Sequence, residues 1–237
     1  MELLQQPVIG SRVGPMRELL GFSCEFDPRR GHFIRNERRN VDPHYAAAET
    51  IWYLQGSKCT KMIKQFAPKY HMFEDKEDEA NGAYGARISK QHDNLLLKAF
   101  YDLKDGPDNN RRTVVPIFQA RDLAANSKDV PCTCNLKFYL REEGLTMVTD
   151  MRSNDVWLGF PYDTFAFCNI GFMMAKYLEV DFVRYVHQAG SMHLYEKNRK
   201  AAEEAISQTR FPGIESLYWF DALSGGCLLY TSPSPRD

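Results

Sequence analysis

The chain has 237 residues, of which 43% are hydrophobic, and its formal net charge at pH 7 is -1. This length and hydrophobic content suffice for one globular domain with a full core. The balanced charge implies no electrostatic attraction to nucleic acid or to a membrane, so no direct nucleic-acid binding is expected. Neither a long apolar run nor an N-terminal signal segment occurs, so we expect a cytoplasmic protein without membrane contact. The six cysteines lack the spacing of a disulfide framework, which predicts reduced thiols.

Two helices and an extended segment are expected in the first half of the chain. Residues 44–55 carry apolar side chains at helical spacing, and Gly56 follows where a helix ends. Residues 92–103 have a second helical pattern, which the Asp-Gly-Pro-Asp turn at 105–108 stops. The β-branched run at 113–118 then predicts extended chain.

A hairpin and two helices are expected in the second half. Residues 135–141 and 145–151 flank the turn Glu142-Glu143-Gly144, which predicts two paired strands. Residues 164–178 are almost wholly apolar but too short to span a membrane, which predicts a buried central helix. Residues 197–207 predict a polar surface helix. Strands and helices alternate without βαβ regularity, so we expect an α+β fold.

The last residues of the chain differ in character from the rest. Residues 227–237 resemble a translated sequencing adapter, so we expect one domain over residues 1–226 and a non-native tail beyond it. The alternative is a natural, flexible Ser/Pro-rich tail. If the adapter interpretation is right, the natural C-terminus of the domain is missing.

Cys132 and the segment 151–163 carry the strongest functional pattern. Pro131-Cys132 opens a predicted strand, and residues 151–163 read Met-Arg-Ser-Asn-Asp-Val-Trp-Leu-Gly-Phe-Pro-Tyr-Asp. The cysteine is a candidate nucleophile, because arginines elsewhere in the chain could lower its pKa and raise its thiolate fraction. Taken alone, a cysteine is more often a small buried apolar residue. Cys132 and Cys134 lack the companion ligands of a metal site, so no metal is expected.

The order and spacing of these motifs resemble the thymidylate synthase and deoxycytidylate hydroxymethylase superfamily. Further matching segments follow in the family's order: Ser11-Arg12-Val13-Gly14, Glu49-Thr50-Ile51-Trp52-Tyr53-Leu54-Gln55-Gly56, Asn81-Gly82-Ala83-Tyr84-Gly85, Asp108-Asn109-Asn110-Arg111-Arg112 and Gly190-Ser191-Met192-His193-Leu194-Tyr195. The resemblance implies one catalytic domain, with a mixed β-sheet and helices packed around a long buried central helix. It also implies a homodimer formed through the sheet.

The resemblance implies a binding site for a pyrimidine nucleoside monophosphate. The matching phosphate ligands are Arg12, Arg111, Arg112 and Arg152, with Ser153 as an added hydroxyl donor. Planar guanidinium groups suit a phosphate dianion. In the family the adjacent pair, here Arg111 and Arg112, reaches into the neighbouring subunit's site, which makes a two-fold homodimer a functional requirement. Without the resemblance, Arg111-Arg112 would be interpreted as a solvated turn.

The resemblance also implies a mechanism. The Cys132 thiolate would add to C6 of the pyrimidine, and C5 would then attack the one-carbon unit of methylenetetrahydrofolate. Glu49 and Tyr84 match groups that organise water and proton transfer around the base, and His193 and Tyr195 match groups that bind the sugar 3′-hydroxyl. The structural alternatives are a core-edge carboxylate for Glu49, a turn aromatic for Tyr84 and a packed histidine for His193.

A folate site follows from the same resemblance. The matching positions are Asp155, Leu158, Gly159, Tyr162, Tyr70 and Phe73. Asp155 would bond the pterin, the next three would form its wall, and Tyr70 and Phe73 fall where the synthases carry two stacking tryptophans. The structural alternative for Asp155 is a cap of the helix that begins after Pro161.

Asp163 stands where thymidylate synthases carry the asparagine that reads uracil. A carboxyl group accepts well from the exocyclic amine of cytosine, whereas uracil O4 would face an acceptor. Pairing with cytosine N3 then requires a proton on Asp163 or on N3. At positions 133 and 151 the chain has Thr and Met, as the phage deoxycytidylate hydroxymethylases do. We therefore expect folate-dependent C5 hydroxymethylation of dCMP. The structural alternative for Asp163 is a helix N-cap or first-turn acid.

Three functional alternatives stay open. A thymidylate synthase would methylate dUMP reductively and release dihydrofolate. A ribonucleotide enzyme would hydroxymethylate CMP. A catalytically silent homologue would bind nucleotide without turning it over. Comparing product formation from dCMP, dUMP and CMP separates the three.

Overall fold

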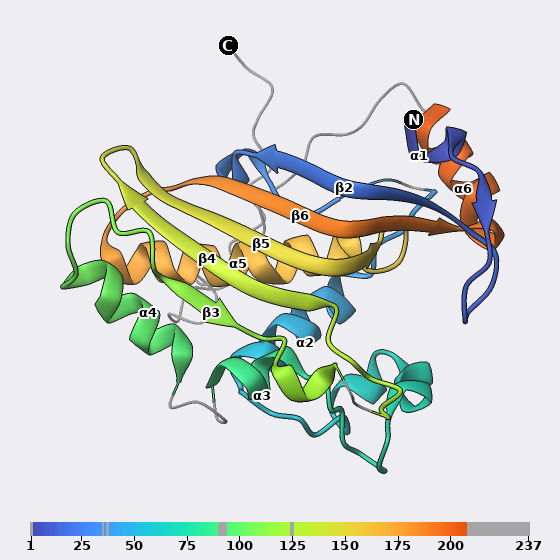
Figure 1. Cartoon of the computed structure of the whole chain (residues 1–237), viewed down its shortest axis with the longest axis horizontal. Coiled ribbons are helices and arrows are strands. Elements are labelled where there is room, and N and C mark those ends of the chain that lie inside the picture. The colour runs from blue at the N-terminus through green and yellow to red at the C-terminus, as the bar shows by residue number, and fades with distance from the viewer. Residues whose placement is uncertain (1, 35, 37, 90–93, 124–125, 208–237) are drawn as a thin grey trace.

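A computed structural model of the chain describes residues 2–34, 36, 38–89, 94–123 and 126–207, so the expected tail at 227–237 lies outside the described residues. The strands are β1 (Val8–Ile9), β2 (Met16–Phe26), β3 (Val114–Pro116), β4 (Thr133–Arg141), β5 (Gly144–Asp155) and β6 (Phe182–Tyr195). They form a six-stranded sheet in the order β1-β2-β6-β5-β4-β3 (Figure 1). Neighbouring strands are antiparallel except β5 and β6, which are parallel. The sheet is therefore mixed, in agreement with the expected α+β fold.

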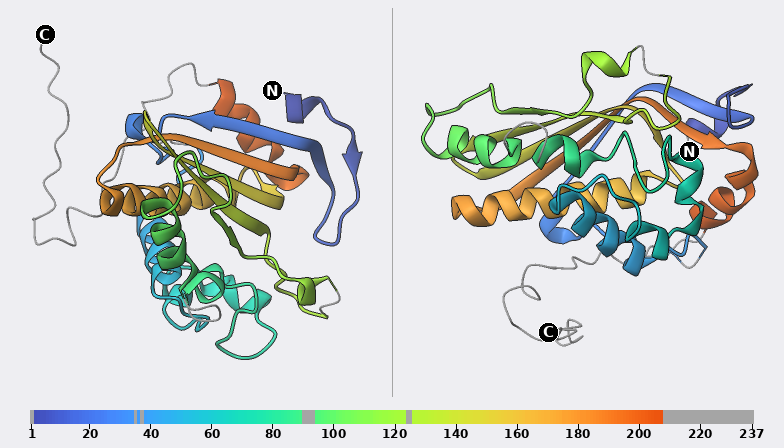
Figure 2. Two further views of the ribbon diagram at one scale, coloured as in Figure 1. Left: turned by 60° about the vertical axis from the view of Figure 1, so that its left-hand side comes forward. Right: turned by 90° about the horizontal axis from the view of Figure 1, so that it is seen from below.

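A long helix is enclosed between the sheet and the other helices. The helices are α1 (Glu2–Gln5), α2 (Pro43–Leu54), α3 (Tyr84–Ser89), α4 (Leu95–Lys104), α5 (Phe160–Leu178) and α6 (Glu196–Ser207). Helix α5 packs against β5 and β6, and α2 packs against α5 on the same side of the sheet (Figures 1 and 2). Every residue from Asp163 to Gly171 is buried as a result. The predicted buried central helix is confirmed.

The other predicted helices are found close to their expected bounds. The pattern at 44–55 corresponds to α2, and the pattern at 197–207 corresponds to α6. The pattern at 92–103 corresponds to α4, although residues 92 and 93 lie outside the described residues. Helix α4 begins after Asn94, whose side chain accepts a hydrogen bond from Leu97 N at 3.1 Å. No helix in the described part of the chain has the length and apolar character needed to cross a membrane.

The predicted hairpin is formed by β4 and β5. Arg141 pairs with Gly144, so only Glu142 and Glu143 connect the two strands. Gly144 has a φ of 130°, and a Cβ atom there would lie 2.5 Å from the backbone oxygen of Asp181. The tight connection therefore requires glycine on both conformational and steric grounds.

Two long strands, β2 and β6, were not predicted from the sequence. They pair with each other along most of their length, from Met16 opposite Tyr195 to Phe26 opposite Tyr185. Alternate side chains of β6, including His187 and Ala189, are buried. The two strands lie far apart in the chain, so no turn between them signals their pairing locally.

This topology gathers distant segments at one end of the sheet, on the right in Figure 1. Thr133 at the start of β4 pairs with Met151 of β5, and Asp155 at the end of β5 pairs with His193 of β6. Helix α5 begins five residues after Asp155, at Phe160. The Cys132 motif and the segment 151–163 therefore meet at the same end.

Candidate active site

Cys132 and Arg152 are adjacent at this end of the sheet. The guanidinium Nη2 of Arg152 lies 3.6 Å from the Cys132 Sγ. Its orientation is fixed because Nε donates to the backbone oxygen of Pro131 at 3.0 Å and Nη2 donates to that of Val130 at 2.9 Å. The backbone N of Arg152 also donates to the Cys132 oxygen at 2.8 Å. The thiol therefore has a cation held beside it.

The electrostatic surroundings of Cys132 differ from the expectation. Burial raises the pKa of the Cys132 thiol, and the positive charge of Arg152 opposes that rise. The negative charges of Asp163 and Asp129 raise the pKa further. The expected lowering of the Cys132 pKa is wrong for this chain, because burial outweighs the effect of one guanidinium.

Two buried carboxyl groups approach the site from α2 and α5. Glu49 and Asp163 are each 8% exposed. Tyr45 Oη donates to Glu49 Oε1 at 2.7 Å, and Asn154 Nδ2 donates to Asp163 Oδ2 at 2.7 Å. Burial raises the pKa of Glu49 to about 7 and, together with the charge of Glu49, raises the pKa of Asp163 to about 8. Both groups can therefore carry a proton near neutral pH.

The structural alternative for Asp155, a cap of helix α5, is not found in the segment between β5 and α5. Asp155 Oδ1 accepts hydrogen bonds from Trp157 N at 2.8 Å and Leu158 N at 3.0 Å, so it caps the turn before α5. It does not cap the helix itself, because α5 begins at Phe160 and its N-cap residue is Gly159, without a side-chain cap. Asp163 lies in the first turn of α5, as its structural alternative predicts.

Two buried carboxyl oxygens of the site have no hydrogen-bond partner among the described residues. They are Glu49 Oε2 and Asp155 Oδ2. An unpartnered buried acceptor is costly, so such atoms fit a site that receives donor groups from a ligand.

Aromatic side chains line the region around Glu49. The Tyr84 ring lies 5.2 Å from that of Tyr53 and 6.0 Å from that of Phe167. The Tyr70 ring lies 5.5 Å from that of Trp52 and 5.8 Å from that of Phe73. Tyr84 and Tyr70 therefore belong to one packed aromatic group.

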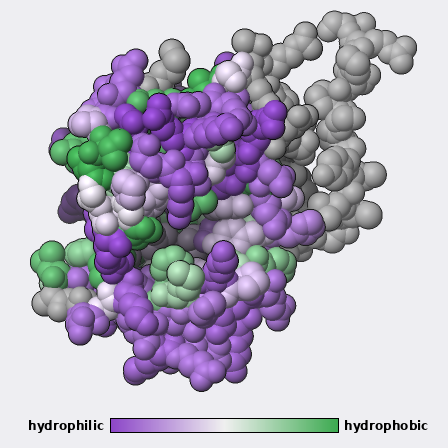
Figure 3. Space-filling model, turned by 90° about the vertical axis from the view of Figure 1, so that its right-hand side faces the viewer, coloured by the Kyte–Doolittle hydropathy of each residue, from purple (hydrophilic) through white to green (hydrophobic). Residues whose placement is uncertain are grey.

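The residues expected to contact folate differ in exposure. Phe73 is 51% exposed and Leu158 is 45% exposed, whereas Tyr162 is half-buried and its Oη accepts from Asp42 N at 3.0 Å. Figure 3 views the end of the molecule at the right of Figure 1, where the surface is hollowed between its upper and lower parts. Phe73 and Leu158 are therefore accessible to a flat ligand, whereas Tyr162 is only partly accessible.

The residues expected to bind the sugar lie at the end of β6. Ser153 Oγ and His193 Nδ1 are 3.3 Å apart, and the ring of His193 lies 5.1 Å from that of Tyr195. Burial raises the pKa of Tyr195, while a hydrogen bond with Ser11 and the positive charge of Arg12 lower it. The Ser11–Arg12 loop therefore lies beside Tyr195, and Arg12 itself is exposed.

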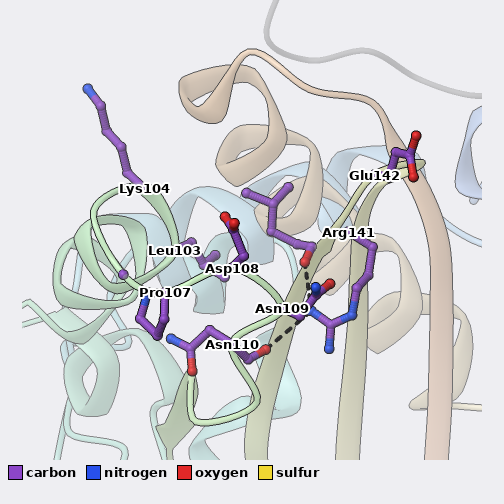
Figure 4. A pocket seen from close by; sticks show the side chains of 10 residues that line it. Leu103, Lys104, Pro107, Asp108, Asn109, Asn110, Arg141 and Glu142 are labelled. Atoms are coloured by element: carbon purple, nitrogen blue, oxygen red, sulfur yellow. Dashed lines mark hydrogen bonds between the residues drawn. The ribbon is translucent and has the colours of Figure 1, made fainter.

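Arg111 and Arg112 are not brought to this site within one chain. Both are exposed in the loop between α4 and β3. The loop is anchored at the hairpin end of β4, where Arg141 Nη1 donates to Asn110 O at 3.2 Å (Figure 4). Asn110 Oδ1 in turn accepts from Arg112 N at 2.9 Å. Cys132 lies beyond the other end of β4, so the length of the strand separates it from the arginine pair.

Figure 4 shows a polar pocket beside this loop, distinct from the Cys132 site. It is lined by α4, the loop and the hairpin: Leu103, Lys104, Gly106, Pro107, Asp108, Asn109, Asn110, Leu140, Arg141 and Glu142. The pocket lies between the anchored loop and the hairpin, and no residue predicted to bind substrate or take part in catalysis lines it.

Sequence reasoning missed three residues behind Asp163. His187 Nε2 lies 3.0 Å from Asn154 Oδ1, and His187 Nδ1 lies 3.0 Å from Tyr185 Oη. Through Asn154 they form a hydrogen-bonded chain that ends at Asp163. The only sequence signal is the alternation of Tyr185 and His187, which places both on one face of a strand once that strand is known.

Comparison with known proteins finds similar sequences among thymidylate synthases and hydroxymethyltransferases. A thymidylate synthase from Vesicomyosocius okutanii subsp. Calyptogena okutanii (strain HA) is 23% identical over 198 residues, which cover 81% of this chain and 74% of that protein. A deoxyuridylate hydroxymethyltransferase from Bacillus phage SP01 is 27% identical over 205 residues, covering 79% of this chain. The chain spans about half, 52%, of that phage protein's length.

Structural similarity shows the fold. The thermostable thymidylate synthase A from Bacillus subtilis superposes with a TM-score of 0.74 at 18% identity, covering 87% of this chain and 74% of that one, which identifies a shared fold. The thymidylate synthase family model matches residues 11–217, which include every predicted site residue. The chain belongs to the thymidylate synthase family.

Proposed function

We propose that this protein hydroxymethylates dCMP at C5, with methylenetetrahydrofolate as the one-carbon donor. Members of the family are folate-dependent one-carbon transferases, so the reaction class follows from membership. The choice of dCMP and of a hydroxymethyl product is our proposal. One observation carries it, namely the buried carboxyl group of Asp163 at the position that would read the base.

Base recognition follows from the protonation of that carboxyl group. With a pKa of about 8, Asp163 holds a proton at neutral pH. A neutral carboxyl group has one O–H donor and one C=O acceptor. Cytosine offers the matching acceptor at N3 and the matching donor at its exocyclic amine, so one side chain can satisfy both positions.

The side chains around Cys132 have separate tasks in the proposed reaction. Cys132 Sγ adds to C6 of the base, and Arg152 stabilises the thiolate that this addition requires. Glu49, whose pKa is about 7, takes up and returns a proton at the water that completes a hydroxymethyl product. Tyr84 assists as a hydroxyl donor near the base.

Phosphate, sugar and folate would be held by the remaining predicted residues. Arg12, Arg152 and Ser153 would bind the phosphate with Arg111 and Arg112 of a second subunit. His193 and Tyr195 would bind the 3′-hydroxyl. Methylenetetrahydrofolate, when bound, supplies the one-carbon unit. The residues that would hold it are Asp155, Leu158, Gly159, Tyr162, Tyr70 and Phe73.

Hydroxymethylation of dUMP is a second candidate, because the phage relative at 27% identity is named for deoxyuridylate. The chemistry allows it. A neutral carboxyl group donates through either oxygen, so it can also give a proton to uracil O4 and accept from N3–H. A thymidylate synthase reaction on dUMP is distinguished from both by release of dihydrofolate.

Asp163→Asn tests the proposal. An amide donates to O4 and accepts from N3–H, so the ratio of kcat/KM for dCMP to that for dUMP should fall at least about tenfold. Asp129→Asn is a matched control, because Asp129 is another partly buried carboxyl group with a raised pKa, and its charge also acts on Cys132. An unchanged ratio in Asp163→Asn, or an equal fall in Asp129→Asn, would remove Asp163 from base reading.

A further inference from the structure

Three buried side chains form one hydrogen-bonded chain that ends at the candidate base-reading residue, Asp163. Tyr185 and His187 are fully buried on β6, and Asn154 on β5 is 4% exposed. The links are Tyr185 Oη to His187 Nδ1 at 3.0 Å, His187 Nε2 to Asn154 Oδ1 at 3.0 Å, and Asn154 Nδ2 to Asp163 Oδ2 at 2.7 Å. We call these three residues, Tyr185, His187 and Asn154, the relay.

With the Asn154 amide oriented as in the structure, the hydrogen bonds of the relay all run in one direction. Burial lowers the pKa of His187 to about 3, so its ring is neutral and has a single N–H. Asn154 Oδ1 is an acceptor, so that N–H is at Nε2 and Nδ1 accepts from the Tyr185 hydroxyl. Each residue of the relay then donates to the next, and the last donor, Asn154 Nδ2, points at Asp163 Oδ2.

This direction assigns different roles to the two oxygens of Asp163. Oδ2 accepts from Asn154, so a neutral Asp163 carries its proton on Oδ1. We propose that Asn154 and His187 are positioning residues that fix which oxygen of Asp163 donates, and thereby decide whether its site accepts cytosine or uracil. The inference rests on the proposed role of Asp163 as the residue that reads the base.

The hydrogen bonds of the relay oppose reversal of the Asn154 amide alone. A reversed amide would turn its oxygen toward Asp163 Oδ2 and its NH₂ group toward the His187 N–H. The ring of Phe160 stands edge-on to His187 at 4.9 Å. A Cβ atom on Gly159 would lie 3.1 Å from both Asn154 Nδ2 and Asp163 Oδ2, so the two groups are enclosed closely there.

Other groups that titrate also face Asp163 and bear on its pH dependence. Glu49 of α2 and Asp155 of β5 raise the pKa of Asp163, after burial itself, whereas the Asn154 hydrogen bond lowers it. The charge of Asp163 in turn acts on Tyr45, Tyr53, Tyr70, Tyr84, Cys132 and Tyr185. Loss of the Asn154 donor should therefore raise the pKa of Asp163 further, since that donor favours the ionised form.

Two substitutions test the relay in the full chain. Asn154→Ala removes the donor to Asp163, and His187→Phe keeps an aromatic ring against Phe160 while removing the donor that orients Asn154. With either, the Asp163 proton can occupy either oxygen. The ratio of dissociation constants for dUMP and dCMP should move toward one, by about tenfold for Asn154→Ala, the loss of one strong hydrogen bond. The alkaline limit of dCMP binding should also move to higher pH.

Asn169 and His32 provide a matched control pair. Asn169 Nδ2 and His32 Nε2 are 3.3 Å apart, both residues are buried, and burial lowers the pKa of His32 to about 4. Asn169 lies on the same helix as Asp163, and neither residue belongs to the relay. Asn169→Ala and His32→Phe should leave the base ratio and its pH profile unchanged.

The role of the relay and the proposed substrate can fail independently in these experiments. A wild-type protein that prefers dUMP contradicts the proposed substrate, but the relay is still judged by the change in ratio between variant and wild type. An unchanged ratio in both relay variants, or an equal change in the controls, overturns the inference. If Asn154→Ala does not fold, His187→Phe gives the decision.

Discussion

In the proposed reaction, the chemistry depends most directly on Cys132 and the guanidinium beside it. Cys132→Ser replaces the thiol with a much weaker nucleophile, so turnover should fall by about a thousandfold or more while nucleotide still binds. Product formation and a nucleotide titration measure the two effects. Cys134→Ser is the matched control, two residues further along the chain at the start of β4. Comparable loss in both variants would mean that Cys132 has no special role.

Single residues also show how far sequence reasoning reaches. Cys132, Arg152, Glu49 and Asp163 were all expected near one another, and the sheet and α2 bring them to the same end of the molecule. The relay was not expected, because Asn154 and His187 are 33 positions apart and meet only when β5 pairs with β6. Family motifs identify groups that touch a ligand more readily than groups that act through another residue.

At the level of elements, helices α2 and α5 bring Glu49 and Asp163 together, so the protonation of Asp163 affects the stability of the fold. The pKa of Asp163 is raised from 3.8 to about 8, so the folded state holds a proton that the unfolded state has already released. The contribution of Asp163 to the free energy of unfolding is fully present below about pH 4, and it is lost as the pH rises to about 8. Asp163→Asn should therefore gain stability relative to wild type as the pH rises through this range.

Urea unfolding at both ends of that pH range measures this effect. The exposed Asp108, replaced by Asn, is the control for the substitution itself. A stability difference for Asp163→Asn that stays constant with pH would contradict a protonated, buried Asp163.

The β4–β5 hairpin depends on a single glycine. Gly144→Ala should destabilise the protein by about 2 kcal/mol or more, since the new Cβ atom would lie 2.5 Å from Asp181 O at a φ of 130°. Gly10→Ala is the control, because a Cβ there meets nothing within 4 Å, and its effect should stay within about 0.5 kcal/mol. Equal free energies of unfolding for the two variants would contradict the hairpin geometry.

Elements with local signals were predictable, and those without were not. The hairpin has its turn in the sequence, and α5 has a long apolar pattern, so both were expected near their observed bounds. Strands β2 and β6 pair across most of the chain, with Met16 opposite Tyr195. Their pairing depends on tertiary contacts that no short window of sequence contains.

At the level of the whole molecule, one chain does not bring the four predicted phosphate-binding arginines together. Arg111 and Arg112 lie at the far end of β4 from Cys132, in an anchored loop. We therefore predict that a second subunit supplies them. Mixing inactive Cys132→Ser with an Arg111→Ala/Arg112→Ala double variant should restore activity, to about a quarter of wild type when chains exchange freely in equal amounts.

The size of the recovery is diagnostic. Half of the dimers in such a mixture are heterodimers, and each contains one site with both the thiol and the arginine pair. The matched control mixes Cys132→Ser with Asp163→Asn, because both changes lie in the site of their own chain. No recovery in the first mixture, after subunit exchange is verified, would mean that the arginines do not act across subunits.

The most direct measurement is mass spectrometry of the nucleotide formed from dCMP or dUMP with methylenetetrahydrofolate, together with the absorbance change that accompanies dihydrofolate. We predict 5-hydroxymethyl-dCMP from dCMP, without dihydrofolate. Methylated dUMP with dihydrofolate, and no modified dCMP, would contradict hydroxymethyl transfer to cytosine.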